Sequence, residues 1–150
     1  MKIAIGSDHG GFALKSEILK HIQEQGYEVK DFGCYSLESV DYPDIAREVG
    51  EAVVKGEFDR GILICGTGIG ISIAANKIPG VRAALCGDCF SAKLTRQHND
   101  SNILTMGERV LGVGLAKMIT DIWLTTEFEG GRHGLRVDKI SDIECRYNRE

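Results

Sequence analysis

The chain has 150 residues, of which 43% are hydrophobic and 27% charged, and its formal net charge is −4. This composition is typical of one globular domain, because a chain of this length buries roughly two-thirds of its unfolded surface around a single core. It excludes a disordered chain, and the acidic balance excludes the basic surface with which a nucleic-acid binder contacts phosphates. The apolar run from Ile3 to Gly6 is too short for a signal sequence or a membrane span, so we expect cytoplasmic residence and no membrane partner.

The first half of the chain alternates between strand and helix patterns. Lys2–Ser7 is a short apolar run that predicts a buried strand, and residues 12–25 carry apolar side chains at helical spacing. Gly26 ends that helix, a second strand is expected over residues 27–32, and a proline favours a second helix over residues 43–54.

The second half continues the alternation. Arg60–Cys65 is a continuous apolar run of the kind found in a central strand that is covered on both faces. Glycines follow it and lead into a helix expected over residues 69–77. Further strands are expected over residues 81–86 and 103–106, and further helices over residues 89–98 and 113–124.

Five strands, each followed by a helix, predict an α/β fold in which right-handed crossovers build a parallel sheet covered on both faces. We interpret residues 1–150 as one domain. Its last part, about residues 127–150, is interpreted as an arm made of a glycine-rich loop and a polar helix near residues 141–148. We expect the loop, which contains Arg132, His133 and Arg136, to be mobile.

The strongest local signal is Cys65 at the end of the third strand, followed by Gly66-Thr67-Gly68-Ile69-Gly70. Ligands of parallel sheets bind beyond the carboxyl ends of the strands, and N–H groups at a helix N-terminus favour a thiolate or an oxyanion there. A buried cysteine with glycines that serve only the turn is an equally good interpretation of these residues. The dinucleotide motif G-x-G-x-x-G fails, because Ile71 or Ile73 stands where its third glycine would fall.

Other candidates gather in three places. Asp8 and His9 follow the first strand and could bind a hydroxyl or phosphate and assist proton transfer, although Asp8 could serve only as a helix cap. His98 ends a helix, where the helix dipole alone would explain it. Arg132 and Arg136 offer planar forks of donors that suit a phosphate, although solvated arginines are commoner.

The five cysteines are an odd number, which argues against a disulfide framework and predicts reduced thiols. Cys86 and Cys89 have the CxxC spacing of redox and zinc motifs. No second pair of ligands follows at a matching spacing, so we interpret both as structural.

Several segments together resemble the RpiB/LacAB family of sugar-phosphate isomerases, and the likeness covers nearly the whole chain. They are Ile5 to Gly11, Asp41 to Asp44, Cys65 to Gly70, Arg96 to Asn99, and Gly131 to His133 with Arg136. The resemblance implies a Rossmann-like three-layer sandwich. It further implies no metal ion or cofactor, and a homodimer or dimer of dimers whose active sites combine residues of two subunits.

The same resemblance implies that Cys65 moves a proton between C1 and C2 of the sugar, while Thr67 relays protons between the oxygens. The enediolate would be held by the backbone of Gly66, Gly68, Ile69, Gly70 and Ile71. The proton on a sugar carbon next to a carbonyl is only weakly acidic, so the reaction needs a base and a stabilised oxyanion together. The end of the third strand offers both.

Further roles implied by the resemblance concern substrate binding. Asp8 and His98 would open the cyclic sugar, and Asn99 would hold oxygens of the substrate and intermediate. The phosphate would be bound by His9, Arg109, Arg132 and Arg136.

We therefore expect an enzyme that interconverts ribose 5-phosphate and ribulose 5-phosphate. Within the family, the alternative is a hexose phosphate such as allose 6-phosphate or galactose 6-phosphate. Outside it, the alternative is a noncatalytic sugar-phosphate sensor, which would need the arginines but not a base at Cys65.

Overall fold

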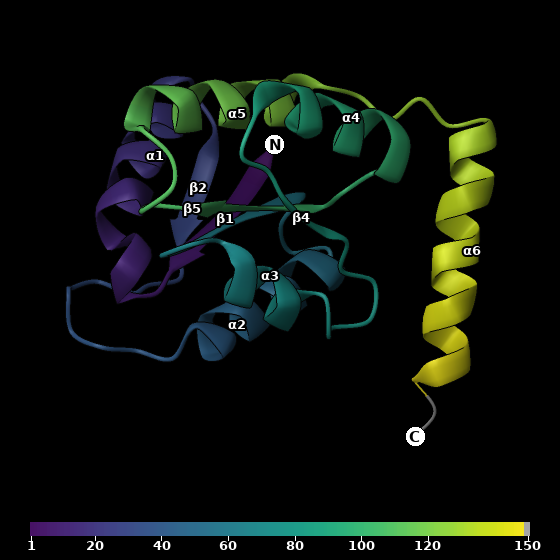
Figure 1. Ribbon diagram of the computed structural model, residues 1–150, viewed down its shortest axis with the longest axis horizontal. Coiled ribbons are helices and arrows are strands. Elements are labelled where there is room, and N and C mark those ends of the chain that lie inside the picture. The colour runs from purple at the N-terminus through teal and green to yellow at the C-terminus, as the bar shows by residue number, and fades with distance from the viewer. Residues whose placement is uncertain (149–150) are drawn as a thin grey trace.

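The computed structural model describes residues 1–148, which form a five-stranded sheet in the order β2-β1-β3-β5-β4 (Figure 1). The strands are β1 (Lys2–Ser7), β2 (Glu28–Asp31), β3 (Arg60–Cys65), β4 (Ala83–Leu85) and β5 (Ile103–Gly107). The helices are α1 (Phe12–Glu24), α2 (Tyr42–Val54), α3 (Ile69–Ala75), α4 (Cys89–Asn99), α5 (Val113–Thr125) and α6 (Arg132–Tyr147). All the strand pairs are parallel, so the predicted α/β fold is confirmed.

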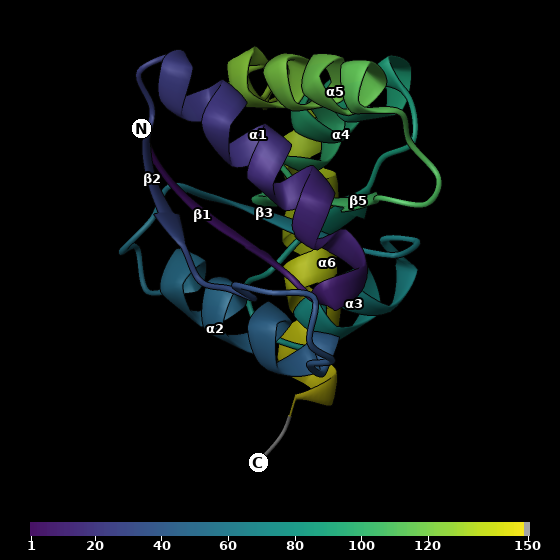
Figure 2. The ribbon, with the colours of Figure 1, turned by 90° about the vertical axis from the view of Figure 1, so that its left-hand side faces the viewer.

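Side chains alternate across the sheet and build one core layer on each face. Ile62 and Ile64 of β3 pack with residues of α1, α4 and α5, whereas Leu63 and Cys65 pack with residues of α2 and α3. Figure 2 shows the two groups of helices on opposite sides of the strands. The three-layer sandwich expected from the sequence is therefore present.

Strand β3 lies in the middle of the sheet, and all of its residues are buried. Even Arg60 is only 8% exposed, because its guanidinium donates hydrogen bonds to the carbonyls of Trp123 and Leu124 at 2.8 and 3.0 Å. Burial on both faces is the physical reason for the continuous apolar run. It also places Cys65 at the end of the most enclosed strand.

The last helix begins earlier than predicted. α6 begins at Arg132 and not near residue 141, so Arg132, His133 and Arg136 lie on a helix and the expectation of a mobile loop there was wrong. Gly134 does not break the helix, because a glycine inside a helix costs only about 1 kcal/mol and His133, which is 5% exposed, packs against α4. Figure 1 shows α6 as an arm outside the three layers.

Most other element boundaries differ little from the predicted ones. The edge strand β4 is shorter than expected, since it covers Ala83–Leu85 and not residues 81–86, and α3 ends at Ala75 and not at residue 77. Such differences are normal at the ends of elements, where hydrogen bonding fades. Within residues 1–148, no helix is both long enough and apolar enough to cross a membrane.

A buried lysine fixes the loop that leaves β2. Lys15 of α1 is 1% exposed, and its Nζ lies 2.8 Å from both carboxylate oxygens of Asp31. The same ammonium donates to the Cys34 carbonyl. The Ser7 N–H donates to the Gly33 carbonyl and the Cys34 N–H donates to the Ser7 carbonyl, each at 2.6 Å. This loop is therefore tied to the end of β1.

We expect Lys15→Met to lower the free energy of unfolding by about 3 kcal/mol, because it leaves the Asp31 carboxylate without its buried cation. Urea unfolding measures the change. Lys20→Met is the matched control, since Lys20 forms only an exposed pair with Glu24 at 4.0 Å and should change stability by less than about 0.5 kcal/mol. Equal losses in the two variants would contradict the account.

Candidate active site

The carboxyl ends of β1, β3 and β5 meet at one edge of the sheet. The register pairs Ser7 with Ile64 and Cys65 with Gly107, so the loops after these strands begin side by side. The loops after β1 and β3 are in close contact, since a Cβ built on Gly10 would lie 3.3 Å from the Gly66 nitrogen. We call residues 8–11, 65–71 and 107–111 the carboxyl edge.

Cys65 is 5% exposed, and its Sγ accepts a hydrogen bond from the Gly68 N–H at 3.1 Å. Gly68 has a φ of 79° and lies directly before α3. A Cβ at this position would approach the Met106 carbonyl carbon to 2.7 Å, so both the backbone conformation and the space require glycine. The glycine thus lets an N–H group at a helix start point at the sulfur, which suits an anionic sulfur.

The backbone after Cys65 provides further donors. Gly70 and Ile71 lie in the first turn of α3, before the first helical hydrogen bond from Ser72 N–H to the Gly68 carbonyl. Their N–H groups therefore have no acceptor within the helix. Unpaired N–H groups at the start of the helix that follows the Cys65 loop are the kind of donors that hold an oxyanion.

Thr67 is exposed at the mouth of a cavity of about 310 Å³. Its Oγ1 accepts a hydrogen bond from the Ile69 N–H at 3.2 Å. The walls are mostly apolar and come from Ile69, Leu85, Cys86, Gly87, Gly107, Val110 and Leu111. Among these lining residues, Thr67 alone carries a hydroxyl.

Asp8 and His9 occupy the loop after β1. Asp8 is 7% exposed, and its Oδ1 accepts the Gly11 N–H at 3.1 Å, so it does cap the short turn of residues 9–11. His9 Nδ1 accepts the Val40 N–H at 3.2 Å. A neutral His9 must then carry its proton on Nε2, which makes that nitrogen a donor.

Arg109 lies over the loop after β3. Its N–H donates to the Gly66 carbonyl at 3.0 Å, and a Cβ built on Gly66 would lie 3.4 Å from the Arg109 Nη1. The side chain is exposed, and the arginines that form ion pairs within residues 1–148 are others, namely Arg47, Arg82 and Arg96. The Arg109 guanidinium is therefore available to an anion at the carboxyl edge.

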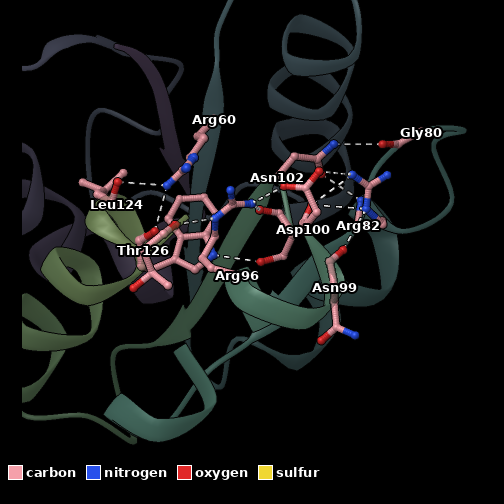
Figure 3. Close-up of polar contacts among 11 residues, drawn as sticks. Arg60, Gly80, Arg82, Arg96, Asn99, Asp100, Asn102, Leu124 and Thr126 are labelled. Carbon is pink, nitrogen blue, oxygen red and sulfur yellow. Dashed lines mark hydrogen bonds and ion pairs between the residues drawn. The ribbon is translucent and has the colours of Figure 1, made fainter. Parts of the chain in front are cut away.

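His98 and Asn99 lie at the opposite edge, where α4 ends and the chain turns into β5. Asp100 turns the chain there with a φ of 46°. Arg82 Nε donates to the Asn99 carbonyl at 3.1 Å, and Arg96 Nη1 donates to Asp100 Oδ1 at 2.8 Å (Figure 3). This network of charged hydrogen bonds fixes the end of α4.

The arm adds to this second group of residues. Arg132 and Arg136 are exposed on the first turns of α6, and His133 stacks its ring on that of His98 at 4.1 Å between centroids. We call His98, Asn99, Arg132, His133 and Arg136 the amino edge.

The structure does not bring all the predicted site residues together within one chain. Gly61 pairs with Ile103 at the start of the two strands, and Cys65 pairs with Gly107 at their end. At 3.3 Å per residue these two levels are about 13 Å apart. Asp8, His9, Arg109 and residues 65–71 belong to the carboxyl edge, whereas His98, Asn99, Arg132 and Arg136 belong to the amino edge.

Sequence reasoning gave His133 no role of its own. The structure shows it buried against His98, with its Nε2 3.4 Å from Glu129 Oε2. The signals in the sequence were its place between two candidate arginines and its membership of a segment that resembles the family. Ligand atoms of His98, Glu129 and His133 lie within 4.8 Å of one another, but the two rings are stacked at 10°. Because a metal ion lies near the plane of each imidazole that binds it, this stacked arrangement does not suit a shared ion.

The CxxC pair has an environment that disfavours redox chemistry. Burial, assisted by the nearby Asp88 carboxylate, raises the pKa of Cys86 to about 11. A thiol with such a pKa is protonated at neutral pH and is a poor nucleophile. The structural interpretation of Cys86 agrees with this environment.

Comparison with known proteins places these features in a family. The family model described as Ribose/Galactose Isomerase matches residues 3–140. The chain is 58% identical over 147 residues to ribose-5-phosphate isomerase B of Escherichia coli, covering 98% of this chain and 99% of the relative. A more distant relative, D-erythrulose-4-phosphate isomerase of Pectobacterium atrosepticum, is 43% identical over 96% of this chain and 95% of the relative.

Solved structures agree with this result. The structure of Clostridium thermocellum ribose-5-phosphate isomerase B matches with a TM-score of 0.98 and 60% identity, covering 99% of this chain and 100% of that one. The chain therefore belongs to the ribose/galactose isomerase family and is an aldose–ketose isomerase.

Proposed function

We propose that the chain interconverts ribose 5-phosphate and ribulose 5-phosphate, with Cys65 as the base. The observation that carries the proposal is the Cys65 thiol, which receives an N–H hydrogen bond from Gly68 at 3.1 Å beside further helix-start donors. The names of relatives at 58% and 60% identity support ribose 5-phosphate as the substrate. The family assignment favours an enzyme over the noncatalytic sensor.

The proposed proton transfer requires no external reactant. In the open aldose, the Cys65 thiolate removes the proton from C2, and the electron pair moves through C1 to leave an enediolate with negative charge on O1. N–H groups of residues 66–71 stabilise this oxygen. Thr67 relays the proton of the C2 hydroxyl to O1 while Cys65 returns its proton to C1, and the product is the ketose.

Ring opening comes before this step for a cyclic sugar. A proton leaves the anomeric hydroxyl, the bond between C1 and the ring oxygen breaks, and the ring oxygen takes up a proton, so the sugar gains and loses one proton. Asp8 and His98 exchange these two protons in the proposed mechanism, and Asn99 holds the sugar oxygens. The phosphate lies among His9, Arg109, Arg132 and Arg136.

Because the two edges are about 13 Å apart along β3, the proposed mechanism requires a second copy of the chain. The carboxyl edge of one copy then meets the amino edge of the other, in a homodimer or a dimer of dimers. Exposed apolar side chains near both edges support such contacts, among them Phe90, Val110 and Leu135, which are 70%, 65% and 66% exposed. Large exposed apolar side chains are the kind that a subunit contact would cover.

We expect Cys65→Ala to fold normally and to lose at least about a thousandfold in kcat, because no other group takes the C2 proton. A coupled assay with ribose 5-phosphate, run in the presence of a chelator, measures the loss, with allose 6-phosphate and galactose 6-phosphate in parallel. Cys145→Ala, at an exposed position of α6, is the control and should keep full activity. Near-normal turnover by Cys65→Ala would reject the proposed base. Turnover of a hexose phosphate alone would keep the base and change the substrate.

A second test addresses the shared site. Cys65→Ala and His98→Ala proteins are unfolded separately and refolded together in equal amounts. Half of the resulting dimers are mixed, and each mixed dimer has one site with both residues intact, so we expect about a quarter of wild-type activity. Each variant refolded alone is the control. Activity that does not exceed the sum of the two controls would contradict a site shared between chains.

A further inference from the structure

His98 has one ring face covered by an aromatic side chain of the arm. Its ring and that of His133 are 4.1 Å apart between centroids and inclined by only 10°. His98 is half-buried, whereas His133 is 5% exposed. The more deeply buried ring therefore acts as the platform on which His98 rests.

The platform itself is fixed. Burial, together with the charges of His98 and Arg132, lowers the pKa of His133 and so favours the neutral ring. Its Nε2 lies 3.4 Å from Glu129 Oε2, and Arg136 lies one helical turn further along α6. A neutral, buried imidazole beside a carboxylate has little freedom to turn.

Residues 126–133, which lead into α6 and form its start, contact three consecutive residues in the last turn of α4. Arg96 Nε donates to the Thr126 carbonyl at 3.3 Å, the Glu129 N–H donates to the Gln97 carbonyl at 3.1 Å, and His98 stacks on His133. The first contact joins a side chain to a backbone carbonyl, the second joins two backbone groups, and the third joins two side chains. A contact that served only to anchor the arm would not need to cover the face of His98.

We propose that His133 is a positioning residue that sets the ring orientation of His98 for opening the cyclic substrate. The inference rests on the proposed function and extends it to a residue without an assigned role. The χ2 torsion of a histidine has broad minima, so a ring without a platform samples many directions. A flat partner at 4.1 Å restricts this rotation and so holds the ring of His98 in one plane.

The test compares two variants that keep the buried volume. His133→Leu fills the space without a flat face, whereas His133→Phe keeps the flat face without ionisable nitrogens. Turnover of ribose 5-phosphate needs ring opening. Exchange of the C1 proton of ribulose 5-phosphate with deuterated water does not, because the phosphorylated C5 hydroxyl cannot close a ring in this ketose. Ser141→Ala, on the exposed part of α6, is the control.

We expect His133→Leu to lower kcat for ribose 5-phosphate by about 10- to 100-fold, the usual loss for a catalytic group displaced by about 1 Å. Its KM and its deuterium exchange should stay within about threefold of wild type, since the phosphate ligands and Cys65 are untouched. His133→Phe should restore most of the lost kcat.

Three results would overturn the inference. Unchanged turnover by His133→Leu would show that His98 needs no platform. Equal losses of turnover and exchange, or a large rise in KM, would mean that His133 only anchors the arm that carries Arg132 and Arg136. Equal defects in the Leu and Phe variants would exclude the stacked face as the cause. A wild-type protein that does not turn over ribose 5-phosphate would instead reject the proposed function, and the inference with it.

Discussion

Cys65 and His98 belong to opposite ends of one parallel sheet, and the geometry of the strands keeps them apart. A strand in a parallel sheet carries its ligand-binding loop at its carboxyl end, and the helix that follows returns the chain to the other edge. Cys65 ends β3, whereas α4 delivers His98 to the start of β5. A mechanism that uses both residues therefore depends on how two chains meet, and not on the fold of one chain alone.

Buried charges stiffen both edges. Lys15 of α1 holds Asp31 and the Cys34 carbonyl of the loop after β2, which is itself bonded to Ser7 at the end of β1, and Arg96 ties Asp100 to the end of α4. Burial of a charge is costly unless it is paired and hydrogen-bonded. Within residues 1–148, every buried side-chain nitrogen and oxygen has a hydrogen-bond partner. The two halves of the proposed site are thus presented by rigid scaffolds, which favours accurate positioning of the reacting groups.

The sequence predicts much of this arrangement, because its signals are local. The apolar run of β3 predicts a strand buried on both faces, and the glycines after Cys65 predict N–H groups at a helix start beside its sulfur. The structure has both features. Strand order is not local, so the alternation of strands and helices could not give the order β2-β1-β3-β5-β4, although a parallel sheet of any order places the ends of β3 and α4 at opposite edges. The early start of α6 and the burial of His133 depend on contact with α4, which no periodicity within residues 127–150 contains.

The most direct measurement is a crystal structure of the Cys65→Ala protein with ribulose 5-phosphate bound. The account predicts that C1 and C2 of the sugar lie beside residue 65 and the helix-start N–H groups of one chain. Arg132, Arg136 and the stacked pair of His98 and His133 should reach the same sugar from a second chain. A ligand whose contacts all come from one chain would contradict the shared site. A ligand bound away from residue 65 would contradict the role of Cys65.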